Sequence, residues 1–432
     1  MSRWVRSFGT FLPWLELLTL AVAAPLLLFP TLRPAWTAGV LIGLALIYLL
    51  RLIVRREPWP VTPFNAALLL FALTIPVAVW ASALPELTLP KLTGLILGLA
   101  AFRAAAFFVR DRRTLLLAVA AFALIGLGIW AVGFLGAGWS TKFPWFAPVV
   151  RRLPRGLTAL PGAPDAGINV NQLAGALAFY LPVAAALAAG WWRERQPVLA
   201  LLALLLAGIA GGTLALTQSR SGWMGSAAGV AGLIALAGWA TGRRRVQILA
   251  VAAPLALIVA GAALTVAQPE AAARFINTSG QTTGEISLSG RPEIWSRALY
   301  AIQDFSFTGA GLGAFRRVVN LLYPLFTVSP DTDIAHAHNI FLQVALDLGL
   351  PGLIAYLAGL WIALGIAWDA AKRSSGMLRG LALGLVAGLL ALHVYGLTDA
   401  IALGAKPGLA FWLALGLIAA LPRVTRAGDA AS

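Results

Sequence analysis

Long apolar runs recur along almost the whole chain, and no other feature of the sequence limits its fold as strongly. A helix of about 20 mainly apolar residues crosses the roughly 30 Å hydrocarbon core of a bilayer. Because lipid offers no hydrogen-bond partners, only helices and closed barrels satisfy their backbone groups there. With 60% hydrophobic and 11% charged residues, the composition excludes an ordinary soluble globular domain. We therefore predict an all-α polytopic membrane protein.

The apolar pattern predicts about twelve transmembrane spans. They cover residues 13–30, 35–51, 63–82, 92–109, 114–137, 169–190, 198–217, 223–241, 246–267, 350–368, 380–398 and 406–422. The chain is thereby divided into nine spans within 1–267, a large external loop with amphipathic helices over 268–337, and three spans within 338–432. Arg3 and Arg6 precede a first run without a clear small-residue cleavage site, so we expect a first span rather than a signal peptide.

The charge balance is strongly basic, at +16. In a soluble protein this would suggest nucleic acid, but membrane proteins concentrate Arg and Lys in their cytoplasmic loops. Basic clusters fall in alternate connections, at 51–57, 110–113, 192–195, 242–245, 372–379 and 423–426. The pattern predicts that both termini are cytoplasmic and that nucleic acid is not a partner.

Two groups of basic residues remain on the opposite, external side. They are Lys142, Arg151, Arg152 and Arg155 in the first group and Arg274, Arg291, Arg297, Arg316 and Arg317 in the second. A solvated loop or contact with lipid phosphate would account for any one of them. Together they indicate that the external face attracts an anionic substrate.

Two arginines stand out by their local context. Arg220 lies in TQSRSGW (217–223), a short polar break between apolar runs that needs no Arg for its structure. Its planar fork of donors suits phosphate, although snorkelling to lipid headgroups is the alternative.

Arg291 begins an amphipathic helix predicted over 290–305. A cation there opposes the helix macrodipole, so anion binding accounts for Arg291 better than a structural role. The apolar face of this helix comprises Ile294, Trp295, Ala298, Leu299 and Ile302.

Two further features are easier to interpret. The glycine-rich turn TGAGLGAF (308–315) lacks the preceding strand and the Lys-Ser/Thr pair of a nucleotide-binding loop, which excludes a nucleotide site of that kind. Arg103 lies within a predicted span, where we expect it to snorkel or to contact lipid phosphate.

The stretch DTDIAHAHNIFLQVALDLGLPG (331–352) holds two of the three histidines. A metal site would recruit His336, His338 and one of Asp331 or Asp333, but no further His is close in sequence and the chain has no cysteine. A second interpretation makes His338 a general base, because Asn339 is a good cap for the apolar helix that follows and a neutral imidazole accepts a proton near pH 7. A third is a merely polar helix start.

The third histidine, His393, lies inside a predicted span near Tyr395 and Asp399. Ionisable groups in spans are functional candidates by default. A hydrogen bond to a neighbouring helix is the structural alternative.

The histidine stretch resembles the signature of O-antigen ligases and the related Wzy-type polysaccharide polymerases. The resemblance rests on His338, Asn339, Gly349 and Gly352, and on NVNQLAGALAFYLP (169–182), SRSGW (219–223) and SGRPEIW (289–295). These motifs agree with the family in order, spacing and membrane side, and they cover about residues 165–400.

The resemblance implies a GT-C-like, metal-independent, inverting glycosyltransferase without a cofactor, in the bacterial inner membrane. Its donor would be a glycan on undecaprenyl pyrophosphate, presented among the membrane lipids at the periplasmic face. Arg220 and Arg291 would bind the pyrophosphate, and His338 would orient or deprotonate the acceptor hydroxyl. The other implied substrate contacts are His336, Asn339, Asn171 and Trp223.

Several functions share these motifs. The pattern fits a ligase, which transfers the whole glycan to lipid A–core. A polymerase, which transfers it to another lipid-linked glycan, and a protein O-glycosylating enzyme stay open. The non-enzyme alternative is a polysaccharide transporter or flippase, but such folds show related halves and polar sites near mid-membrane. Here the polar residues gather at the external surface.

Overall fold

A computed structural model describes residues 3–57, 59–154, 156–157, 168–277, 288–329 and 332–429. The described chain is helical, apart from an isolated β-bridge between Ala137 and Ile168. Arg155 and Asp331, both named above, lie outside the described residues.

Each predicted span coincides with a long helix. The long helices are α1 (Arg3–Leu28), α2 (Pro34–Arg55), α3 (Asn65–Ala81), α4 (Pro85–Phe108), α5 (Arg112–Gly136), α7 (Val170–Arg193), α8 (Pro197–Thr217), α9 (Arg220–Trp239), α10 (Arg244–Ala267), α14 (Ile340–Arg373), α15 (Gly376–Tyr395) and α16 (Leu409–Asp429). Among the described residues, 9 helices are long and apolar enough to cross a membrane. The chain is therefore a polytopic membrane protein, while the total of about twelve spans stays a prediction.

Local sequence sets where several helices begin. Pro34, Pro85, Pro197 and Pro292 lie in the first turns of their helices, where no backbone N–H is needed. Asn169 and Asn339 cap α7 and α14 with their side chains, and Asp111 with Thr114 forms a capping box at α5.

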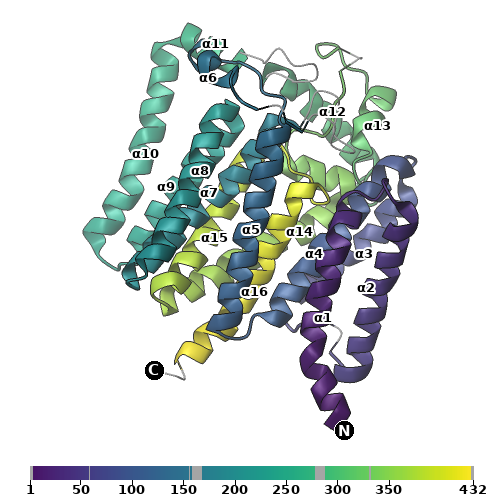
Figure 1. The fold of residues 1–432 in the computed structure, drawn as a ribbon. Helices are drawn as coiled ribbons and strands as arrows, with labels where there is room; N and C mark the ends of the chain where they lie inside the picture. The colour runs from purple at the N-terminus through teal and green to yellow at the C-terminus, as the bar shows by residue number, and fades with distance from the viewer. Residues whose placement is uncertain are drawn as a thin grey trace.

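The two termini lie at the same end of the helical bundle, and the short helices gather at the other end (Figure 1). The short helices are α6 (Ala147–Val150), α11 (Pro269–Asn277), α12 (Arg291–Asp304) and α13 (Phe315–Leu322). This arrangement agrees with the alternation of basic connections. Which end faces the cytoplasm stays a prediction.

Helix α15 packs closely on α7 through a stripe of small residues. Gly380, Gly384 and Gly388 repeat every fourth position and therefore share one face of α15. A Cβ atom at Gly388 would lie 2.8 Å from the Phe179 carbonyl oxygen, so only glycine permits this approach. The close contact holds α15 against α7 along most of its length.

Helix α12 buries a narrower face than its sequence suggested. Ile294, Ala298 and Ala301 are fully buried, at positions i, i+4 and i+7, and they pack with Phe315 of α13. Leu299 is 52% exposed, so the prediction that it belongs to the apolar face was wrong. It lies off the buried stripe that these three residues define.

Arg103 corrects another expectation, because it does not reach the lipid headgroups. Its side chain is fully buried and pairs with Glu16 of α1, which also accepts a hydrogen bond from Arg51 of α2 (2.7 Å). The Arg103 guanidinium also lies 3.9 Å from the centroid of the Tyr48 ring. Charges inside a membrane bundle are retained when they pair with one another. The pairing links α1, α2 and α4.

Candidate active site

Two of the three residues predicted as catalytic, His338 and Arg291, converge with His336 on one acid, Asp399, in the loop after α15. The distances to its carboxylate oxygens are 3.4 Å from His338 Nδ1, 3.5 Å from His336 Nε2 and 3.6 Å from an Arg291 terminal nitrogen. All four side chains are buried, and Asp399 is 2% exposed. Segments that are far apart in sequence thus form one compact cluster at the end of the bundle where the short helices lie.

The histidine pair is held in an unusual backbone conformation. His338 has φ +50°, a left-handed conformation that costs a residue with a side chain roughly 1–2 kcal/mol. The His338 backbone N–H donates to Nδ1 of His336 (3.2 Å), and the two imidazole centroids lie 4.4 Å apart. Because His336 Nδ1 accepts a hydrogen bond, the proton of its neutral ring resides on Nε2, which faces Asp399.

Arg291 reaches the cluster as the first residue of α12, as predicted, and is 4% exposed. One terminal nitrogen lies 3.4 Å from the Ser221 hydroxyl, at the start of α9. That hydroxyl is also within 2.9 Å of the Thr398 hydroxyl, beside Asp399. Arg291 therefore joins α12 to α9 and to the loop that carries the acid.

The charge states of the cluster follow from its burial. Burial raises the pKa of Asp399, but the neighbouring His338, Arg291 and His336 outweigh this effect and hold the pKa well below its usual range. Burial lowers the pKa of His336 to about 3, and the nearby Asp399 carboxylate opposes this shift without cancelling it. At neutral pH, a charged carboxylate thus faces a neutral His336.

Several buried polar atoms of the cluster have no hydrogen-bond partner in the described part of the chain. They are His338 Nδ1, Asp399 Oδ2 and Arg291 Nε. Buried polar groups without partners are costly and recur at functional sites. The cluster thus holds buried polar atoms that are available to contact a bound substrate.

Arg220 lies next to this cluster, at the first position of α9. Its side chain is half-buried and donates to the Phe275 carbonyl of α11, and Ser219 caps the helix by accepting from the Gly222 N–H. Arg220 is the neighbour of Ser221, which contacts Arg291. The turn between α8 and α9 therefore brings both predicted phosphate-binding arginines to one side of the bundle.

Other predicted contact residues occupy the surroundings of the cluster. Asn171 accepts from the Lys142 ammonium through its side chain (3.5 Å) and from the Tyr395 hydroxyl through its carbonyl (2.9 Å). Trp223 stacks with Phe143, with ring centroids 5.7 Å apart. The substrate contacts of both stay predictions.

The Asn339 side chain serves two purposes in the fold. Its oxygen accepts from the Phe341 and Leu342 N–H groups, which confirms the predicted cap, and its amide donates to the Leu397 carbonyl (3.1 Å). Asn339 thus ties the start of α14 to the loop that carries Asp399. Contact with substrate stays a prediction here too.

If a metal bound here, the acid beside the two histidines would be Asp399 instead of the predicted Asp331 or Asp333. Asp333 is paired with Arg316, whereas His336, His338 and Asp399 each offer one ligand atom within 4.8 Å of the others. Two features of the site oppose a cation there: the Arg291 charge faces the same carboxylate, and the His336 Nε2 carries the proton. The expectation of no metal requirement therefore stays a prediction.

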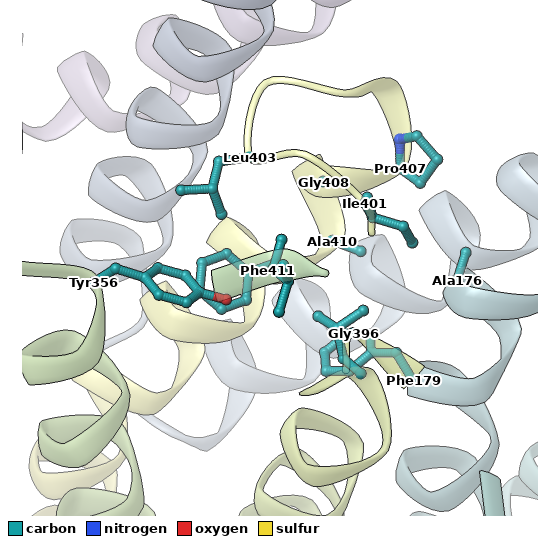
Figure 2. A pocket seen from close by; sticks show the side chains of 12 residues that line it. Ala176, Phe179, Tyr356, Gly396, Ile401, Leu403, Pro407, Gly408, Ala410 and Phe411 are labelled. Carbon is teal, nitrogen blue, oxygen red and sulfur yellow. The ribbon is translucent and has the colours of Figure 1, made fainter. Parts of the chain in front are cut away.

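An apolar cavity lies beside the cluster (Figure 2). Ile340, Gly396 and Ile401 line it and are within three residues of His338 or Asp399. The other lining residues are Ala176, Phe179, Tyr356, Leu392, Leu403, Pro407, Gly408, Ala410 and Phe411. The lining holds no charged group, and the volume of about 20 Å³ accommodates little more than one water-sized group, so no part of a substrate is assigned to this cavity.

His393 forms a hydrogen bond to a neighbouring helix, which was the structural alternative for this residue. Its Nε2 lies 2.6 Å from the Tyr356 hydroxyl of α14, and its Nδ1 lies 2.6 Å from the Leu389 carbonyl. These bonds occupy both ring nitrogens and join α15 to α14.

Asp399 was not predicted as a site residue, and its sequence position near His393 was the only feature given for it. An acid directly after the end of a predicted span was a usable signal. The 60 residues between His338 and Asp399 conceal the contact.

Comparisons with known proteins agree with this geometry. Residues 205–357 match the family model described as O-Antigen ligase. The matched range contains both arginines and both histidines but ends before Asp399. The chain is also similar to a Pseudomonas aeruginosa protein described as O-antigen ligase, with 31% identity over 232 residues, or 51% of each chain. The chain thus spans about half the length of that relative.

Proposed function

We propose that this chain, whose residues 205–357 match the O-antigen ligase family model, transfers a glycan from undecaprenyl pyrophosphate to an acceptor hydroxyl at the periplasmic face of the bacterial inner membrane. The observation that carries the proposal is the convergence of Arg291, His338 and Asp399 in one buried cluster beside Arg220. The cluster combines a cation for phosphate with a base for a hydroxyl.

In the proposed reaction, the acceptor oxygen forms a bond to the anomeric carbon of the donor glycan. The bond from that carbon to the pyrophosphate oxygen breaks, and undecaprenyl pyrophosphate leaves with the electron pair. The acceptor proton passes to Nε2 of His338. Attack from the face opposite the leaving group inverts the anomeric configuration.

The two arginines have one task in this scheme. Negative charge develops on the pyrophosphate as the glycosidic bond breaks, and guanidinium groups that are already in place stabilise it without reorganisation. Arg291, which is 4% exposed, acts where water screens little, and Arg220 adds a second guanidinium at the adjacent turn. Pyrophosphate is a good leaving group, so a strong general acid is not required.

Asp399 assists His338. A carboxylate 3.4 Å from Nδ1 favours the tautomer in which Nδ1 carries the proton and Nε2 is free to accept one. It also stabilises the imidazolium that forms when His338 takes the acceptor proton. Asp399 is thus a positioning residue, and His338 is the base.

The acceptor that we propose is the sugar region of lipid A–core, which makes the chain an O-antigen ligase. Reconstitution in proteoliposomes with a lipid-linked glycan donor tests this directly. Three acceptors are compared: lipid A–core, a second lipid-linked glycan and an acceptor protein. Product on lipid A–core is expected; elongated lipid-linked glycan would instead identify a polymerase, and movement of donor across the bilayer without transfer would identify a flippase.

The role of His338 is tested in the same assay. His338→Ala is expected to lower kcat at least about 100-fold and to leave the KM for the donor nearly unchanged, since general base catalysis contributes about that much. Undiminished kcat in this variant would reduce His338 to a structural residue.

A further inference from the structure

A buried chain of hydrogen bonds connects the glycine-rich turn 308–315 to the histidine pair. The Gly313 N–H donates to Oδ1 of Asp347, and Nε2 of Gln343 donates to the same oxygen, both at 2.8 Å. Oε1 of Gln343 accepts from the N–H of Ala337, also at 2.8 Å. Ala337 is the residue between the two histidines.

The chain of bonds is isolated from solvent. Gln343 is 1% exposed, Asp347 is 5% exposed, and the two lie four residues apart on one face of α14. A buried amide has no water to replace a lost partner, so each bond is costly to leave unmade. In the described part of the chain, Gln343 and Asp347 make no hydrogen bond or ion pair with the Asp399 carboxylate, which places them behind the site.

The glycine-rich turn is itself fixed against α14. The Ala310 N–H donates to the Leu346 carbonyl and the Leu350 N–H donates to the Ser306 carbonyl, both at 2.7 Å. Gly349 has φ +73°, and a Cβ there would lie 2.4 Å from the Phe307 carbonyl oxygen. The turn therefore packs against α14 at Gly349, where the helix is interrupted two residues after Asp347.

We infer that Gln343 and Asp347 are positioning residues that hold the backbone of His338 in its left-handed conformation and so keep His338 facing Asp399. The left-handed conformation of His338 is intrinsically unfavourable, and Gln343 fixes the adjacent peptide by its hydrogen bond to Ala337. Asp347 fixes Gln343 in turn. The catalytic consequence rests on the proposed function, whereas the structural consequence does not.

The chain offers a direct spectroscopic readout, because it contains only three histidines. Imidazole ¹⁵N spectra of histidine-labelled protein in nanodiscs report the tautomer and environment of each ring. His393, which is bonded to Tyr356 of the same α14, provides an internal reference away from Ala337.

The test variant is Gln343→Met, which keeps side-chain length and removes both hydrogen bonds. We expect shifted signals for His336 and His338, unshifted signals for His393, and a kcat lowered about tenfold or more with a donor KM within about twofold. Asp347→Asn keeps Oδ1 as the shared acceptor, so signals and kcat are expected near wild type. Gln247→Met, on α10, is the matched control.

Asp347→Leu provides a second variant if Gln343→Met does not fold, since it leaves the bond to Ala337 in place. We expect the same signals to shift by a smaller amount. Unshifted His336 and His338 signals in a folded variant overturn the inference, whether or not kcat falls. Shifted signals in a protein whose wild type transfers no glycan would sink the proposed function and leave the positioning intact.

Discussion

The replacement Asp399→Asn tests the proposed site most directly, because it removes one charge and almost no volume. The carboxylate is 2% exposed and lies 3.4 Å from His338 Nδ1. In the proposed reaction this carboxylate stabilises the imidazolium that forms on His338; at the strength of a hydrogen bond to a charged group, about 1.5–3 kcal/mol, its removal corresponds to a loss of about 10- to 150-fold in kcat. Arg291 loses a carboxylate that competes with the donor phosphate, so the donor KM is expected to stay level or fall.

The assay measures initial rates of glycan transfer in proteoliposomes over a range of donor concentrations. Removing one partner of a buried ion pair also lowers stability, by about 3–5 kcal/mol, so rates are normalised to the folded fraction. Asp369→Asn, in an exposed pair with Lys372, serves as the control and should match wild type. A kcat for Asp399→Asn within about twofold of wild type would refute the role of the carboxylate.

Three further outcomes are expected. Arg220→Ala and Arg291→Ala should each lower kcat/KM for the donor by at least about 100-fold without loss of expression; retained transfer in both would contradict the phosphate role, as measured by the same rate assay. Transfer should persist in excess EDTA, and a loss that Zn²⁺ or Mg²⁺ restores would favour a metal at His336, His338 and Asp399. Burial lowers the pKa of His336 from 6.5 to about 3. Between these two pH values the unfolded chain binds a proton on His336 that the folded protein does not bind. The free energy of unfolding therefore decreases as the pH drops from about 6.5 towards 3. Thermal unfolding of His336→Gln should lose this part of the pH dependence; an unchanged pH dependence would contradict the shift.

Local patterns in the sequence predicted the helices and several of their ends. Apolar length located every long helix, the Asn339 cap was recognised from residue type, and Arg291 begins α12 as expected. Hydrophobic length and cap residues act within a few positions of one another, so one chain reveals them. The signature of the histidine stretch added the reaction class, which composition alone does not carry.

The missed features are pairings between distant segments. Asp399 and Glu16 are single acids in or beside apolar runs, and each becomes informative only when its basic partners are known. Arg103 was expected to snorkel because Glu16, 87 residues earlier, gave no local sign that it faces the same interior. A one-dimensional pattern shows which residues are buried but not which of them meet.

His338 shows why the site needs support from distant segments. A left-handed residue is most easily a glycine or an asparagine, yet the proposed chemistry requires an imidazole at this position. The conformation persists because neighbouring groups fix both sides of it: Asn339 caps α14 directly after it, and Gln343 holds the Ala337 peptide before it. Local preference and function therefore disagree at His338, and such disagreement is expected where a fold maintains strain for chemistry.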